Sequence, residues 1–259
     1  MSSLSVVTVT FNNADGLRKT LHSLAALRDR PQEVVVIDGG STDDTPAVVR
    51  EFETQLAVVF ASEPDRGIYH AMNKGHSRCR GELVHYLNAG DTVFGEPYRR
   101  LTQPCLLPVH VHDEHGRFFF KEFIRHGGRA YCHQGVLFER EHAPYDEAYR
   151  VAADLDLMLG CFPQGLRGLP QISGGGVRFD QGGVSSRAAR AQDDEFRAIF
   201  YRRLSWWKAS RLHAGMILKR LVPRKLRRAL MKLGCGGAGG LHDRIAGQDE
   251  RKSCALETR

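Results

Sequence analysis

The sequence predicts an α/β protein with a mainly parallel, Rossmann-like sheet flanked by helices, and two observations lead to this prediction. Apolar runs of strand length alternate with segments of helical periodicity over residues 4–91. The run Val34–Ile37 has no polar alternation, which is typical of a strand buried on both faces of a parallel sheet. Because 42% of the 259 residues are hydrophobic, the chain can bury a core, which excludes an intrinsically disordered protein.

Each predicted helix of this region has a local signal. Leu17, Leu21 and Leu24 repeat at i, i+4 and i+7 and predict a helix that starts near Asp15. Thr45 followed by Pro46 predicts the N-cap and first position of a second helix. Such alternation predicts right-handed crossovers and a ligand site at the carboxyl ends of the strands. The predicted strands are 4–11, 33–38, 56–61 and 82–87, and the third helix is 68–79.

The remainder of the chain is less regular. Residues 102–128 resemble an insertion, and glycine-rich strands and turns are expected over 166–186. We expect one domain over residues 1–200, a basic amphipathic helical segment over 201–234 and a flexible tail over 235–259. Within the domain, the further predicted elements are strands at 117–121 and 131–140 and helices at 153–161 and 192–207.

The net charge of +7 is concentrated near the end of the chain. Residues 196–242 hold twelve Lys or Arg and no Asp or Glu, so the rest of the chain is acidic. Residues 223–233 place leucines at helical spacing between basic residues, and Trp206 and Trp207 lie upstream. This pattern is typical of a helix that lies in a membrane interface, so we expect the segment to bind an anionic membrane surface. The alternative is that the apolar stripe packs on the domain. No nucleic-acid motif accompanies the basic charge, so no nucleic-acid partner is expected.

The cysteines and the N-terminus indicate a compartment. The six cysteines form no C-x-x-C pair, which favours reduced thiols. The first residues alternate like a strand and lack a basic region, unlike a signal peptide. No apolar run reaches eighteen residues. We therefore expect a cytoplasmic protein, peripheral on the inner membrane.

Acidic residues at the predicted strand ends indicate a ligand site. The sequence has neither G-x-G-x-x-G after the first strand nor G-x-x-x-x-G-K-[ST], which argues against a nicotinamide dinucleotide site and a P-loop. Asp38 ends the second strand and suits a ligand with hydroxyl groups or a base amide. Asp91 follows a glycine after the fourth strand and suits a divalent cation that also binds substrate phosphates.

Four segments, taken in order, resemble glycosyltransferase family 2, whose members are inverting enzymes with the nucleotide-sugar-binding GT-A fold. The resemblance is strongest to small bacterial enzymes that build exopolysaccharide, such as colanic acid, or lipopolysaccharide. The segments are LSVVTVTFN at 4–12, VIDGGSTDDT at 36–45, SEPDRGIYHAMNKG at 62–75 and LNAGD at 87–91.

The resemblance implies roles for these residues. Arg66 and Asn73 would lie near the diphosphate or sugar, and Asp91 would bind Mg²⁺ or Mn²⁺. Ala89 stands where the family usually has another acid, so the cation would be held by Asp91 alone. The residues implied to hold the nucleotide base and ribose are Thr10, Phe11, Asp38, Glu63 and Pro64.

The second half of the chain must supply a base for the acceptor hydroxyl. The segment AADLDL at 152–157 resembles the family's acidic motif and makes Asp154 the expected base, with Asp156 as the second candidate. The segment YCHQGVLF at 131–138 resembles the acceptor-side strand and would place His133 in the active site. Asp154 has the alternative of capping the following helix, and His133 that of a core histidine.

The predicted function is transfer of a sugar, with inversion, from a UDP- or GDP-sugar to a lipid-linked saccharide in bacterial surface polysaccharide biosynthesis. One alternative is a nucleotidyltransferase on a similar sheet, although the loop after the first strand lacks the Gly, Arg and Lys residues that it needs. Another is a non-catalytic module that binds a nucleotide sugar or nucleic acid. The retained acids Asp38, Asp91 and Asp154 favour an enzyme.

Overall fold

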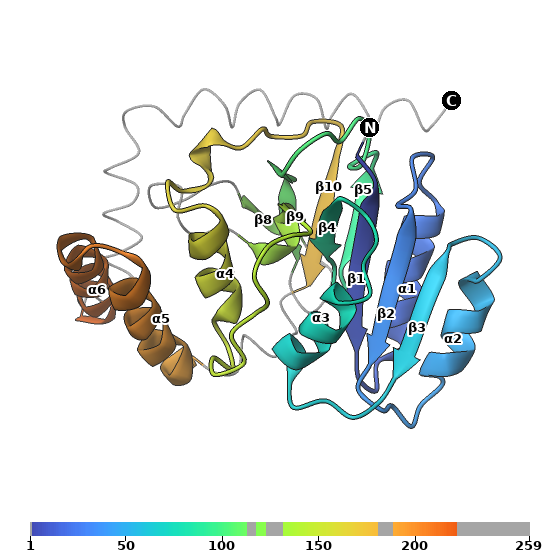
Figure 1. Cartoon of the computed structure of the whole chain (residues 1–259), viewed down its shortest axis with the longest axis horizontal. Coiled ribbons are helices and arrows are strands. Elements are labelled where there is room, and N and C mark those ends of the chain that lie inside the picture. The colour runs from blue at the N-terminus through green and yellow to red at the C-terminus, as the bar shows by residue number, and fades with distance from the viewer. Residues whose placement is uncertain (1, 113–117, 123–131, 181–188, 222–259) are drawn as a thin grey trace. The chain divides into compact units, whose positions relative to one another are not determined.

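The computed structural model describes residues 2–112, 118–122, 132–180 and 189–221 (Figure 1). The chain divides into two compact units, residues 1–203 and 204–259. The candidate site residues all belong to the first unit. The leucine-containing basic stretch 223–233, on which the predicted membrane contact rests, and the segment predicted as a flexible tail, 235–259, lie outside the described residues.

A six-stranded sheet forms the centre of the first unit, in the order β3-β2-β1-β4-β9-β6. The first four strands of this order are parallel, β9 is antiparallel to β4, and β6 is antiparallel to β9. This arrangement confirms the predicted mainly parallel α/β sheet. The strands are β1 (Leu4–Thr10), β2 (Glu33–Asp38), β3 (Val58–Ser62), β4 (Leu83–Tyr86), β6 (Cys105–Leu106) and β9 (Val136–Glu139).

The connections of the parallel strands determine where a ligand binds. The chain runs from β1 to β2 to β3 in one direction through α1 (Ala14–Ala25) and α2 (Thr45–Phe52), which contact each other. It then returns past β1 to β4 through α3 (Ile68–His76), which contacts β1 and β2. Right-handed crossovers in opposite directions place α3 on the opposite face from α1 and α2. The order therefore reverses between β1 and β4, and a crevice at their carboxyl ends is where open α/β sheets bind ligands.

A second, four-stranded sheet has the order β5-β10-β7-β8. It directly continues the chain after β4, since β5 begins at Thr92. Its strands are β5 (Thr92–Gly95), β7 (Val109–His112), β8 (Phe118–Glu122) and β10 (Gly175–Asp180). The remaining helices are α4 (Ala153–Cys161), α5 (Ala189–Arg203) and α6 (Trp206–Leu221), with 3₁₀ turns at His133–Gly135 (η2) and Leu166–Gly168 (η3).

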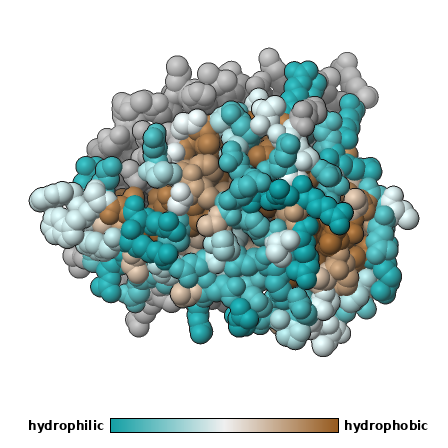
Figure 2. Space-filling model, in the orientation of Figure 1, coloured by the Kyte–Doolittle hydropathy of each residue, from teal (hydrophilic) through white to brown (hydrophobic). Residues whose placement is uncertain are grey.

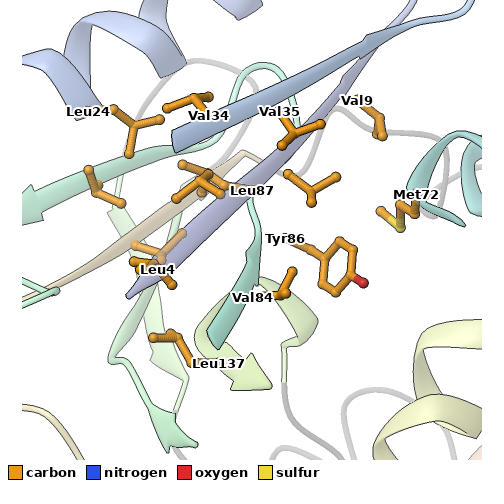
Figure 3. Packing of buried hydrophobic residues seen from close by; sticks show 14 of the residues in the cluster. Leu4, Val9, Leu24, Val34, Val35, Met72, Val84, Tyr86, Leu87 and Leu137 are labelled. Carbon is orange, nitrogen blue, oxygen red and sulfur yellow. The ribbon is translucent and has the colours of Figure 1, made fainter. Parts of the chain in front are cut away.

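The core lies on both faces of β1, β2 and β4, all of whose residues are buried. Figure 3 shows side chains of these strands and of β9 around Leu24 of α1 and Met72 of α3. Burying each such aliphatic side chain contributes about 1.5–3 kcal/mol. A Cβ on Gly75 would lie 2.5 Å from Val7, so glycine is what lets α3 approach β1 this closely. Hydrophilic residues cover much of the face in Figure 2, with hydrophobic ones showing between them.

Several predicted elements differ from the structure. The predicted N-cap Thr45 is the first residue of α2, whose N-cap is Asp44, and the helix predicted over 68–79 ends at His76. Within the described residues of the strand predicted over 131–140, only Val136–Glu139 form a strand, because Gly135 N–H bonds to the Cys132 carbonyl (2.9 Å) and closes a 3₁₀ turn. The helix predicted over 192–207 is two helices, since α5 ends at Arg203 and α6 begins at Trp206. Ser205, a residue type favoured at N-caps, precedes α6. Within the described residues, none of the helices is both long enough and apolar enough to cross a membrane.

Candidate active site

The loops after β1 and β2 are bonded to each other at the carboxyl edge of the sheet, the lower edge in Figure 1. Asn12 adopts a left-handed conformation (φ 46°), and its N–H donates to the Ser41 hydroxyl (2.7 Å). Its side-chain oxygen accepts from Thr42 N–H (2.9 Å), and Asp43 accepts from Ala14 N–H (2.9 Å). The two loops therefore form one fixed rim.

Asp38 lies beneath this rim and is fully buried. Its Oδ2 accepts from Ser41 N–H (3.0 Å) and from the Ser62 hydroxyl (2.6 Å), and its Oδ1 accepts from the Ser41 hydroxyl. The carboxylate thus joins the ends of β2 and β3 to the rim. Its predicted contact with the nucleotide stays a prediction, and Ser41 and Ser62 are partners that the sequence pattern did not single out.

Thr10 and Phe11 end β1 beside this rim. The Thr10 hydroxyl oxygen is buried and has no hydrogen-bond partner within the described part of the chain. Phe11 is 63% exposed, and a Cβ on Gly39 would lie 3.2 Å from its ring, so the ring lies over the glycine. An exposed ring offers a stacking surface for a nucleobase, which is typically worth about 1–3 kcal/mol. The placement supports the nucleotide-binding role predicted for both residues.

The loop after β3 contains Glu63 and Pro64 and is held by Lys74 of α3. The Lys74 ammonium lies 3.4 Å from both the Glu63 carboxylate and the Pro64 carbonyl, and 2.6 Å from Asp65. Glu63 N–H donates to the Asp38 carbonyl (3.0 Å). Glu63 and Pro64 therefore lie next to Asp38, as their predicted common role at the base requires.

Arg66 and Asn73 both contact Glu147. The Arg66 guanidinium is 72% exposed and lies 2.8 Å from one Glu147 oxygen, while Asn73 Nδ2 donates to the other (3.1 Å). Asn73 also accepts from Tyr145 N–H (2.8 Å) and donates to the Tyr145 carbonyl (3.0 Å). The Asn73 amide is therefore committed to the loop before α4, which favours a structural role, whereas Arg66 keeps N–H groups free to reach an anion.

Asp91 follows the turn at the end of β4, where Gly90 adopts a positive φ of 108°. Asp91 N–H donates to the Asn88 carbonyl (3.0 Å), and the Thr20 hydroxyl donates to the Asp91 carbonyl (2.7 Å). The Asn88 side-chain oxygen is buried without a partner in the described structure. The turn lies beside the reversal point between β1 and β4, where Asn13 Nδ2 donates to the Ala89 carbonyl (3.2 Å).

The oxygen donors of this turn suit a divalent cation whose other ligands are supplied mainly by the substrate. Among the described residues, no group of three His, Cys, Asp or Glu could hold a metal ion. Carboxylate and amide oxygens are nevertheless the donors that Mg²⁺ accepts, and Mg²⁺ is commonly held by one or two carboxylates plus phosphates. Asp91 is the expected ligand, and Asn88, which the sequence analysis did not single out, is a second oxygen donor on the same turn.

Asp154 lies in the first turn of α4 and is partly buried. Its Oδ1 accepts from Leu155 N–H (2.8 Å) and from the Tyr69 hydroxyl (3.4 Å). Burial raises the pKa of Asp154 to about 6, because it outweighs these two bonds, which favour the charged form. A carboxylate with a pKa near the working pH suits a general base. The geometry is consistent with the role of base predicted for Asp154.

Asp156, the second candidate base, is 3% exposed. Both of its oxygens accept bonds from the Arg203 guanidinium, at 2.7 and 2.6 Å. The guanidinium thus occupies both carboxylate oxygens of Asp156, which leaves them unavailable to an acceptor hydroxyl. The structure therefore favours Asp154 and gives Asp156 the role of joining α4 to α5.

His133 lies in the core and is 4% exposed. Its Nε2 lies 2.5 Å from the Tyr145 hydroxyl, and its ring packs against Tyr86 and Phe138. Burial lowers the pKa of His133 to about 3, so the ring is neutral at physiological pH. Of the two readings of the sequence, this placement favours the core histidine over the active-site residue.

Comparison with known proteins identifies the first part of the chain. Residues 5–104 match the family Glycosyl transferase family 2. An uncharacterized glycosyltransferase of Mycobacterium tuberculosis is 43% identical over 94 residues, which are 36% of this chain and 36% of that protein. A PGL/p-HBAD biosynthesis glycosyltransferase of Mycobacterium bovis is 29% identical over 61% of this chain and 69% of its own length. The succinoglycan biosynthesis protein ExoO of Rhizobium meliloti is 25% identical over 72% of this chain and 63% of its own length. The match to the first of these relatives thus spans only about a third of its length.

Solved structures share the fold. Residues 1–349 of Staphylococcus aureus TarS, in complex with UDP-GlcNAc, align with a TM-score of 0.62 at 16% identity, over 83% of this chain and 71% of that one. The mannosyltransferase PcManGT of Pyrobaculum calidifontis, in complex with GDP-Man and Mn²⁺, aligns with a TM-score of 0.59 at 20% identity, over 98% and 81%. The predicted GT-A fold and the predicted resemblance to family 2 are confirmed.

Proposed function

We propose that the protein transfers a sugar from a nucleotide-sugar donor to an acceptor hydroxyl with inversion, on the premise that residues 5–104 match Glycosyl transferase family 2. The observation that carries the proposal is the gathering of Thr10, Phe11, Asp38 and Asp91 where the strand order reverses. Open α/β sheets bind nucleotides at this point.

In the proposed reaction, Asp154 acts on the acceptor, and Arg66 and Asp91 act on the diphosphate of the donor. Asp154 accepts the proton of the acceptor hydroxyl, whose oxygen forms a bond to the anomeric carbon as the bond to the diphosphate breaks. Attack opposite to the leaving group inverts the anomeric configuration. Arg66 binds the diphosphate through its free N–H groups. Asp91 would hold a Mg²⁺ or Mn²⁺ ion, which would neutralise the negative charge that grows on the leaving group.

The proposed donor is a UDP- or GDP-sugar. Phe11 and the Asp38 rim provide a base-binding surface, and the two solved structures above hold UDP-GlcNAc and GDP-Man. The proposed acceptor is a lipid-linked saccharide of bacterial surface polysaccharide biosynthesis. The names of the relatives, PGL/p-HBAD biosynthesis and succinoglycan biosynthesis, support this class of product.

We further propose that the enzyme works on the cytoplasmic face of the membrane. In the second unit, Trp206 and Trp207 begin α6 and are 62% and 78% exposed. Lys208 and Arg211 follow on the same helix. Indole rings next to basic residues suit the headgroup level of an anionic leaflet. A lipid-linked acceptor would be presented at the same surface.

A donor panel tests the function. The full chain is incubated with UDP- and GDP-sugars, an isoprenoid-linked saccharide and Mn²⁺ or Mg²⁺, and the released nucleoside diphosphate is measured. We expect acceptor-dependent release with one nucleotide class. Release of pyrophosphate from a nucleoside triphosphate and a sugar phosphate would indicate the nucleotidyltransferase instead. Binding of a nucleotide sugar without turnover with any acceptor of the panel would indicate a non-catalytic module.

A further inference from the structure

One carboxylate of α5 binds the chain immediately before α4. Oε1 of Glu195 accepts from Arg150 N–H (2.8 Å), and Oε2 accepts from the N–H groups of Val151 (2.9 Å) and Ala152 (2.8 Å). Three consecutive backbone donors thus converge on one side chain that is 43 to 45 residues away in the sequence.

The sequence before α4 explains why an external carboxylate is needed. The first N–H groups of a helix have no partner within it, and Ser, Thr, Asp or Asn usually supplies one. At α4 the N-cap is Ala152, which makes no side-chain cap bond. Glu195 binds the backbone N–H of this N-cap and of the two residues before it, and its negative charge is favourable next to the positive end of the helix.

Asp154 depends on the orientation of this turn. It lies two residues after Ala152, and its Oδ1 is shared between Leu155 N–H of the same turn and the Tyr69 hydroxyl of α3. A rotation of the turn would move the carboxylate relative to Tyr69. Among the described residues, α5 also contacts this turn through Arg203, which binds Asp156, while Arg202 binds Asp146 (2.6 Å) of the loop before α4.

We propose that Glu195 is a positioning residue for catalysis: by binding the three N–H groups before α4, it sets the first turn of that helix and holds the Asp154 carboxylate against Tyr69. The inference rests on the proposed function, in which Asp154 is the base. It assigns a role to a helix that lies outside the matched segment 5–104.

Glu195 also acts on Asp154 through its charge. The titratable groups around Asp154 are Tyr69 of α3, Tyr145 of the preceding loop and Glu195 of α5. His133 of η2 is neutral, and Arg203 of α5 is paired with Asp156. Burial is the main reason for the raised pKa of Asp154, and the negative charge of Glu195 raises this pKa further. Removing that charge therefore lowers the pKa of Asp154.

Three variants of the full chain test the proposal. Glu195→Gln removes the charge and one of the two acceptor oxygens, Glu195→Asp keeps the charge on a shorter side chain, and Arg202→Gln is the matched control on the same helix. We expect Glu195→Gln to lower kcat by about 10- to 100-fold, the scale of a misplaced reacting group. The donor KM should stay unchanged. The acid limb of the kcat/KM profile should leave its wild-type position, because the lost charge lowers the pKa of Asp154 and release of Asp154 from Tyr69 raises it. Glu195→Asp should keep the position of that limb, and Arg202→Gln should match the wild type.

Two results would overturn the proposal. One is a wild-type kcat and pH profile for Glu195→Gln. The other is an equal loss of kcat in Glu195→Gln and Arg202→Gln with no shift of the limb, which indicates support of the fold alone. If the wild type transfers no sugar, the proposed function fails. The carboxyl titration of Asp154, followed by ¹³C NMR in the wild type and in Glu195→Gln, then decides separately whether Glu195 acts on Asp154. A shifted midpoint in the variant supports this, to lower pH where the lost charge dominates and to higher pH where Asp154 leaves Tyr69, and an unchanged midpoint overturns it.

Discussion

The Tyr69 hydroxyl oxygen of α3 lies 3.4 Å from Oδ1 of Asp154 on α4 and donates a hydrogen bond to it. The bond connects the segment that matches Glycosyl transferase family 2, residues 5–104, to the part of the chain that supplies the candidate base. The Tyr69 ring also stacks on Tyr145, with 5.4 Å between the centroids. Burial raises the pKa of Tyr69, so its hydroxyl stays protonated and acts as a donor.

We expect Tyr69→Phe to retain the fold and to change the pH dependence of transfer. The bond to Tyr69 lowers the pKa of Asp154, so its loss raises this pKa. The acid limb of the kcat/KM profile should move to higher pH, and activity should fall by a few-fold near pH 6 and less at pH 8. Because the phenyl ring can still stack on Tyr145, the melting temperature should change little.

Tyr98→Phe is the matched control for this measurement. Tyr98 is also a buried tyrosine with one hydroxyl partner, His85 Nδ1 at 2.7 Å. This variant should lower stability by about 1–3 kcal/mol, the cost of leaving a buried polar group without its partner. It should leave the acid limb in place. If the acid limb of Tyr69→Phe lies at the same pH as that of the wild type, the 3.4 Å bond from Tyr69 does not affect the pKa of Asp154.

Asp154→Asn should abolish transfer and stabilise the fold. Asparagine keeps the acceptor for Leu155 N–H but cannot take a proton, so transfer should fall by about 10²- to 10⁴-fold while donor binding persists. The buried carboxylate has a pKa of about 6 against an ordinary value of 3.8. Its ionisation in the folded state therefore costs up to about 3 kcal/mol at neutral pH, a cost that the amide does not carry.

The sign of this effect gives a pH signature. Because the folded state holds the Asp154 proton more tightly than the unfolded state does, this group makes the wild type lose stability as the pH rises from about 4 to about 6. Denaturant unfolding at several pH values should show a stability advantage of Asp154→Asn that grows through this window and is constant above it. An advantage that is absent at pH 7 would contradict the raised pKa, and transfer lost only in Asp156→Asn would move the base to Asp156.

Asp91→Asn should remove the effect of the divalent cation. Nucleoside diphosphate binding by calorimetry should tighten with Mn²⁺ in the wild type and not in the variant, and kcat should fall by about 10²-fold or more. Asp44→Asn is a suitable control, since Asp44 is an exposed rim residue whose side chain makes no capping bond. Full wild-type transfer in excess chelator would contradict the role of the cation.

Local sequence signals predicted much of the fold. The strand Glu33–Asp38 and the helix Ala153–Cys161 have their predicted bounds, because an unbroken apolar run and a short apolar helical repeat are local patterns. The division near Ser205 was missed, although serine is a common N-cap, because helical periodicity continues on both sides of it.

The sequence predicted those site residues that can be recognised by their type and by their position at or just after the end of a strand. Asp38 was found because it ends a strand of a parallel sheet, and Asp91 because it follows the glycine turn after another such strand. Which groups they bind was not predictable, since Ser62 reaches Asp38 only through the pairing of β2 with β3. The contacts of Glu195 with α4 were not predictable either, because they join segments that are more than forty residues apart.

The last prediction concerns the start of α6. If Trp206 and Trp207 bind the headgroup region, the full chain should sediment with anionic vesicles at low salt, less at high salt and poorly with neutral vesicles. Trp206→Ala together with Trp207→Ala should reduce sedimentation several-fold, because two exposed indole rings are lost while the net charge is unchanged. Phe11→Ala is the control, since Phe11 is 63% exposed, as Trp206 is at 62%, but belongs to the first unit. If the double variant sediments as well as the wild type does, these two rings do not anchor the protein. If Phe11→Ala reduces sedimentation as much as the double variant does, the binding is driven by exposed aromatic area in general rather than by this helix.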